Sequence, residues 1–155
     1  MKTPEHPIFL ESVEYIRSQI GKTGLNSVQQ SVLERIIHSS GDLSMQSYLR
    51  FSSHACEEAI NALKKGANIV TDTYMAEAAV SPVAKRTLNS NVQCILEMAP
   101  EFVHSSSNTR SEMGMRKMWL DIEKKKECLE GPVVLIGSAP SALMTLLDLI
   151  EEGTK

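Results

Sequence analysis

The stretch GPVVLIGSAPS, residues 131–141, decides the fold, because it has the pattern of a strand, a turn and the start of a helix. Gly131 and Pro132 end the preceding helical stretch, and the apolar run at 133–136 is typical of a buried strand. Pro140 suits the first turn of a helix, where its missing N–H does no harm. The large apolar residues of that helix, at positions 143, 146, 147 and 150, are expected to face the core. A strand that leads directly into a helix indicates an α/β domain.

Helical and strand-like stretches alternate along the rest of the chain. The pattern predicts a three-layer α/β fold, with a mostly parallel sheet flanked by helices. Further strands are expected at 67–70 and 91–96. Further helices are expected from residue 7, over 27–37, from Ser52 or Ser53 to Gly66, and over 109–127, with a less regular stretch after Pro82. A chain of 155 residues predicts a single domain over residues 1–155.

Composition narrows the class of protein. The net charge of -3 argues against a nucleic-acid binder, which needs a basic face. No apolar run has the length of a membrane span, and the first residues, MKTPEH, lack the apolar core of a signal peptide. Cys56, Cys94 and Cys128 are odd in number and far apart, which indicates reduced thiols of a cytoplasmic protein and no structural zinc site.

His38 is the first candidate for chemistry. It ends the amphipathic stretch 27–37 and is followed by two serines and Gly41, so it should lie at a helix C-terminus. The negative end of the helix dipole favours a protonated imidazole, and histidine titrates near neutrality. Two interpretations are open: a poised proton donor, or a capping histidine that only bonds the last carbonyls.

Asp72 and the turn at 137–141 follow two of the expected strands. Open α/β sheets bind ligands at the carboxyl ends of their strands, so Asp72 is expected either to contact a substrate or base, or to cap the next helix through Met75. At the turn, backbone amides at a helix N-terminus suit a carboxylate or phosphate, although a purely structural turn fits equally well. The turn lacks the pattern of a P-loop.

Arg110 stands between Thr109 and Ser111 at the expected start of a helix. A positive charge is unfavourable at that end of the helix dipole, which indicates another use for the arginine. Its planar fork of donors would bind a carboxylate through two hydrogen bonds. The alternative is a surface arginine paired with Glu112.

Five segments together resemble the precorrin-8X methylmutase family of cobalamin biosynthesis. In chain order they are IFLES at 8–12 with YIR at 15–17, RIIHSSGD at 35–42, GANIVTD at 66–72, NTRS at 108–111 and IGSAPSAL at 136–143. The resemblance runs from about residue 6 to residue 153. One departure falls in the last segment, where the family has an asparagine and this chain has Ser138.

The resemblance implies an isomerase that moves a methyl group between neighbouring carbons of ring C of precorrin-8X or cobalt-precorrin-8. Such a reaction is intramolecular and needs no cofactor and no methyl donor. His38 would be the general acid. The residues that would hold the substrate are Ser12, Asp72, Thr109, Arg110, Ser111 and Ser138.

The resemblance also implies that this chain lacks the family's C-terminal segment, which adds several tens of residues beyond the last matched helix. A non-catalytic tetrapyrrole-binding or carrier protein is therefore the alternative function, and a plain interaction module is a third. A homodimer is expected, because a parallel sheet needs both faces buried and a partner subunit would supply the cover.

Overall fold

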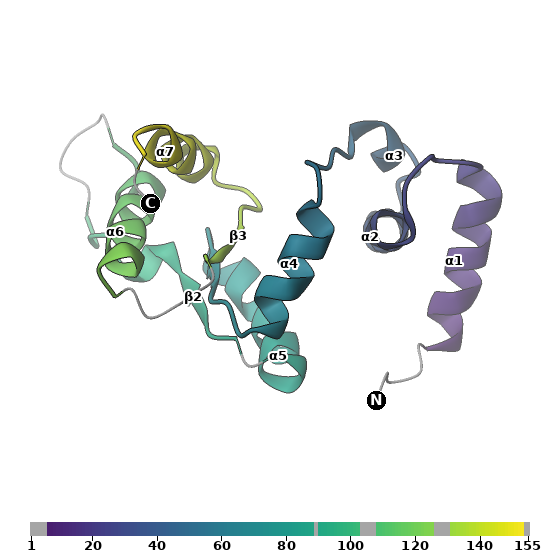
Figure 1. Cartoon of the computed structure of the whole chain (residues 1–155), viewed down its shortest axis with the longest axis horizontal. Helices are drawn as coiled ribbons and strands as arrows, with labels where there is room; N and C mark the ends of the chain where they lie inside the picture. Colours follow the sequence, from purple (N-terminus) through teal and green to yellow (C-terminus); the bar gives the residue numbers. More distant parts are fainter. Residues whose placement is uncertain (1–5, 89, 103–107, 126–130, 154–155) are drawn as a thin grey trace. The chain divides into compact units, whose positions relative to one another are not determined.

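The computed structural model describes residues 6–88, 90–102, 108–125 and 131–153. The chain packs as two compact units, Met1–Glu58 and Ala59–Lys155, and the boundary falls within helix α4 (Ala55–Lys64). Figure 1 shows the elements of both units. The expectation of a single domain stays a prediction.

The first unit consists of helices. Helix α1 (Pro7–Ile20) begins at a proline, as the sequence predicts, and α2 (Ser27–Ser40) begins with a capping box between Asn26 and Gln29. The short α3 (Met45–Tyr48) was not expected from the sequence. Ile16 of α1 packs with Leu33 and Ile37 of α2 in a small buried cluster. This cluster holds α1 against α2.

Helix α2 is three residues longer than the expected range of 27–37, so His38 lies inside its last turn. The hydroxyls of Ser39 and Ser40 donate to carbonyls four residues earlier, at 2.6 and 2.9 Å, so both side chains have hydrogen-bond partners within the last turn. Gly41 then ends it with a left-handed backbone (φ 69°) that glycine adopts without strain.

The second unit is built on a parallel sheet. Strands β1 (Ile69–Thr71), β2 (Val92–Cys94) and β3 (Val133–Leu135) lie in the order β2-β1-β3, with Ile69 opposite both Val92 and Val133. The central strand β1 is buried along its whole length. Helix α5 (Tyr74–Thr87) packs on β1 and β2. The predicted α/β architecture, a parallel sheet flanked by helices, is confirmed.

Helix α5 corrects one expectation, because it continues through Pro82 to Thr87. Proline removes one backbone hydrogen bond from a helix interior, which normally favours a break. Here Ala84, two residues later, is fully buried, so tertiary packing outweighs the local preference.

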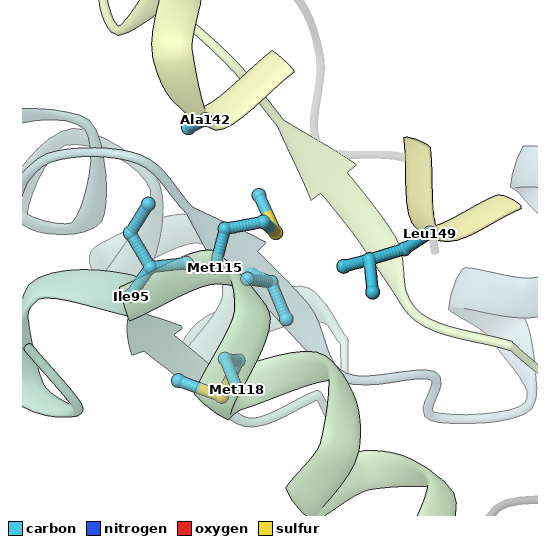
Figure 2. Packing of buried hydrophobic residues seen from close by; sticks show 6 residues of the cluster. Ile95, Met115, Met118, Ala142 and Leu149 are labelled. Atoms are coloured by element: carbon cyan, nitrogen blue, oxygen red, sulfur yellow. The ribbon is translucent and has the colours of Figure 1, made fainter. Parts of the chain in front are cut away.

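The remaining elements of the second unit are the 3-10 helix η1 (Ile95–Glu97), α6 (Arg110–Lys125) and α7 (Pro140–Glu151). Figure 2 shows Met115 and Met118 of α6 packed with Ile95, Ala142 and Leu149. Gly114 allows this packing: a Cβ at Gly114 would overlap the backbone carbonyl of Ile95. Helix α6 and the 3-10 helix η1 can therefore approach this closely only at a position where α6 has no side chain.

Helix α7 buries only part of the face that was expected. Leu146 packs against the core cluster as expected, but Leu143, Leu147 and Ile150 are 52%, 47% and 56% exposed. Ala142 and Leu149 are buried in their place. The helix is apolar on nearly every side, so two stripes follow the helical period and periodicity does not choose between them.

Candidate active site

His38 of α2 and Ser12 of α1 contact each other in the first unit. The imidazole Nδ1 and the Ser12 hydroxyl oxygen are 2.8 Å apart, which is hydrogen-bonding distance. The bond engages one ring nitrogen and leaves Nε2 as the nitrogen that a substrate would use. His38 is exposed and Ser12 is partly buried. The structure therefore brings together two of the residues that the sequence singled out.

Phe9 also contacts His38, and the sequence analysis did not identify it as a site residue. Its ring meets the His38 ring edge to face, with centroids 5.0 Å apart and planes at 83°. The Arg35 guanidinium lies 4.1 Å from the centroid of the same phenyl ring. Spacing contained the signal: Phe9 and Ser12 are three residues apart, as are Arg35 and His38, so each pair shares a helix face.

A second contact fixes α1 against α2 close to this pair. Arg17 donates to both carboxylate oxygens of Glu34, at 2.7 and 3.0 Å, and Gln30 donates to the same carboxylate at 2.9 Å. Burial by itself raises the pKa of Glu34, but the bonds from Arg17 and Gln30 hold that pKa below its ordinary value. The ion pair helps set the distance between the helices that carry Ser12 and His38.

Asp72, at the end of β1 in the second unit, is fully buried. Its Oδ2 accepts the backbone N–H groups of Gly137, Ser138 and Ala139 at 2.9, 2.7 and 2.9 Å. Burial would raise the pKa of the Asp72 carboxyl, but these three bonds favour the charged form and lower it. Asp72 is an ionised carboxylate that holds the turn between β3 and α7.

This geometry corrects two of the alternatives drawn from the sequence. The amides at 137–139 do bind a carboxylate, but that carboxylate belongs to Asp72 and not to a ligand. The cap of α5 is Thr73, whose hydroxyl accepts the Ala76 N–H, so Asp72 does not cap that helix. The side chain of Ser138 is exposed at the same turn.

Thr109, Arg110 and Ser111 lie together at the start of α6. The Thr109 hydroxyl accepts the Glu112 N–H at 3.1 Å, which is the capping pattern, and donates to the Ser141 hydroxyl at 2.7 Å. The Arg110 Nε donates to the carbonyl of Pro100 at 3.0 Å. Arg110 is exposed, and Ser111 is partly buried.

Comparison with known proteins identifies the family. The sequence profile described as "CbiC: Precorrin-8X methylmutase" matches residues 7–155. The chain belongs to the precorrin-8X methylmutase family. It is 29% identical to the cobalt-precorrin-8 methylmutase of Synechocystis sp. over 163 residues, covering 96% of this chain and 71% of that protein. It is 32% identical to the precorrin-8X methylmutase of Pseudomonas aeruginosa over 152 residues, covering 94% of this chain and 67% of that protein.

A solved precorrin-8x methyl mutase from Thermus thermophilus has the same fold. Its TM-score with this chain is 0.78 at 29% identity, and the match covers 94% of this chain and 68% of that one. The predicted family is thereby confirmed. The predicted class of enzyme, a methylmutase, is confirmed as well, since these relatives are named methylmutases. Over the described ranges, no cluster of three potential metal-binding side chains and no helix able to cross a membrane is found.

Proposed function

We propose that this methylmutase-family chain is an isomerase that moves a methyl group between neighbouring ring C carbons of precorrin-8X or cobalt-precorrin-8. The observation that carries the proposal is the contact between His38 and Ser12 at the end of α2. It places a titratable group, with one nitrogen already engaged, in the segment that resembles the family's histidine motif.

His38 is the general acid of this proposal. A proton from Nε2 onto the macrocycle would make ring C more electron-poor, which favours migration of the neighbouring methyl group with its bonding pair. The proton returns to the imidazole after the shift, so the reaction consumes nothing. Ser12 bonds Nδ1 and is expected to contact the substrate as well.

The second unit supplies the groups proposed to anchor the substrate's peripheral carboxylates. Arg110 carries the charge and the two-pronged geometry that a carboxylate needs. Ser111 and the exposed Ser138 offer neutral donors near helix starts. Thr109, whose hydroxyl already donates to Ser141, would take part by fixing the start of α6. Asp72 takes part through the turn that it holds. Anchoring of this kind contributes to rate by fixing the reactive geometry.

The test is the absorbance spectrum after mixing with precorrin-8X, because methyl migration lengthens the conjugated system. Wild type should give the product spectrum. His38→Ala and His38→Gln should lose turnover by about a hundredfold or more while still binding pigment, since neither side chain supplies a proton of suitable acidity. Ser39→Ala, the next residue on α2, is the matched control.

Two outcomes would contradict this proposal. Unchanged turnover in His38→Gln would remove His38 as the acid. Pigment binding by wild type without any spectral change would favour the alternative function, a tetrapyrrole-binding or carrier protein.

The proposal includes a homodimer in the cytoplasm. The exposed apolar residues of α7, among them Leu143, Leu147 and Ile150, form a surface typical of one that another chain covers. Sedimentation equilibrium should show a species of twice the chain mass of 17.1 kDa, and a monomer at all concentrations would contradict the dimer.

The cysteines support the proposed location in the cytoplasm. The free thiols of Cys56 and Cys94 fit a reducing compartment, while Cys128 lies outside the described residues.

A further inference from the structure

Two sets of hydrogen bonds, joined by short stretches of backbone, connect the buried carboxylate of Asp72 to Arg110 within the second unit. The first step of this connection is the set of three N–H bonds from the turn at 137–139 to Asp72. These bonds fix the backbone immediately before Pro140, the first residue of α7. The side chain of Asp72, the residue after β1, therefore helps to fix the first turn of α7.

The second step crosses from α7 to α6. Ser141, one residue into α7, accepts a hydrogen bond of 2.7 Å from the Thr109 hydroxyl. The same Thr109 oxygen accepts the N–H of Glu112 and so caps α6. The Thr109 hydroxyl donates to α7 and accepts from α6, so it links the starts of these two helices.

The third step is the arginine. Arg110 follows Thr109 directly and begins α6, so the conformation of the cap sets where its side chain leaves the backbone. Packing of Gly114 against Ile95 fixes the body of α6 one turn later, but it does not hold the first residue. The Ser141 bond acts on Thr109, the residue directly before Arg110, and the Asp72 contacts act on the turn directly before Pro140 and Ser141.

We infer that Asp72 is a positioning residue for Arg110, acting through the 137–139 turn, Ser141 and Thr109, and that substrate affinity depends on this connection. The inference rests on the proposed role of Arg110 in binding a carboxylate. It assigns Asp72 an indirect role, in keeping with a side chain that is fully buried. It also gives Ser141 a part in binding that its partly buried hydroxyl does not suggest alone.

The first experiment needs no ligand. Hydrogen exchange of the Glu112 amide should speed up in Asp72→Asn and in Ser141→Ala, because each change loosens the cap that this amide bonds to. Asp148→Asn, an exposed carboxylate on the same α7, is the control and should leave that exchange unchanged. An unchanged Glu112 amide in both test variants would overturn the connection itself.

The second experiment measures the affinity of the full chain for hydrogenobyrinic acid, the expected reaction product, by absorbance titration. We expect Asp72→Asn and Ser141→Ala to weaken binding by about tenfold, since small displacements of an anchoring group have effects of this size or larger. In an Arg110→Ala background both effects should disappear, because the group being positioned is gone. A loss of stability alone would not produce that dependence.

The outcomes separate the inference from the proposed function. If Arg110→Ala weakens binding but the other two changes keep their full effect in that background, Asp72 does not act through Arg110 and the inference is overturned. If the Glu112 amide responds but Arg110→Ala leaves affinity unchanged, the contacts exist and the proposed role of Arg110 fails. Ser141→Ala removes only one bond, so the test stands even if Asp72→Asn does not fold.

Discussion

Replacing Arg17 by methionine should show how much the stability of the first unit depends on one ion pair. The change keeps most of the side chain's apolar length and removes both donors to Glu34. The Glu34 side chain is 4% exposed and that of Arg17 is 60% exposed, so the pair is intermediate between a buried ion pair and a surface ion pair. Breaking a fully buried pair costs about 3–5 kcal/mol, whereas a surface pair contributes about 0–1 kcal/mol. We therefore expect a loss of about 2 kcal/mol in the free energy of unfolding.

The loss should depend on pH with a definite sign. The pKa of Glu34 is lowered in the folded chain, so its contribution to stability is present above the ordinary glutamate value, about 4.3, and is lost as pH falls through the lower folded value. The difference between wild type and Arg17→Met should accordingly be largest near pH 7 and shrink below about pH 4. At low pH both proteins carry a protonated Glu34 and neither has the pair.

Urea unfolding followed by circular dichroism measures this difference at each pH. Lys22→Met is the matched control, because it removes an exposed positive charge from the same unit. Arg17→Met and Lys22→Met should differ by about 2 kcal/mol at pH 7. Equal stabilities, or a difference that does not change with pH, would refute the assignment of the stabilisation to the Glu34 carboxylate.

Two further predictions concern the second unit. Arg110→Ala should weaken binding of hydrogenobyrinic acid more than Arg110→Lys, because lysine keeps the charge and loses the fork; equal affinities of wild type and the alanine variant in an absorbance titration would place Arg110 outside the site. Gly114→Ala should destabilise the chain by about 1–3 kcal/mol in urea unfolding, because the added Cβ overlaps the Ile95 carbonyl and outweighs the better helix propensity of alanine; a stabilised variant would contradict the close packing of α6 on η1.

Local patterns predicted those parts of the fold that depend on local chemistry. The strand at 133–135 and the helix starts at Pro7 and Pro140 follow from apolar runs and helix-start signals, and the structure has them. The continuation of α5 through Pro82 and the choice of buried face on α7 depend on contacts with distant residues. Sequence periodicity contains no information about such contacts. The less regular stretch after Pro82 and three of the four core positions on α7 were therefore predicted wrongly.

The candidate site, like the fold, could be predicted from the sequence only in part. Spacing made His38 a candidate, the family resemblance added Ser12, and the structure brings the two residues into contact. Spacing also indicated that the turn at 137–139 suits an anion, but it did not show that Asp72 already occupies the turn. The partner lies 65 or more residues away in the chain, beyond the reach of any local pattern.

That separation has a consequence for the order of folding. The turn at 137–139 and the aspartate that holds it are joined across 65 to 67 residues, so the contact forms only after a long loop has closed. Until then the carboxylate of Asp72 stays hydrated and the start of α7 lacks its fixed geometry. During synthesis, Asp72 therefore emerges well before the backbone amides at 137–139 that it binds. Pairing of β1 with β3 and capture of the turn should be late and coupled events. Because contacts that form late mainly affect the unfolding rate, variants at Asp72 should mainly speed unfolding of the second unit.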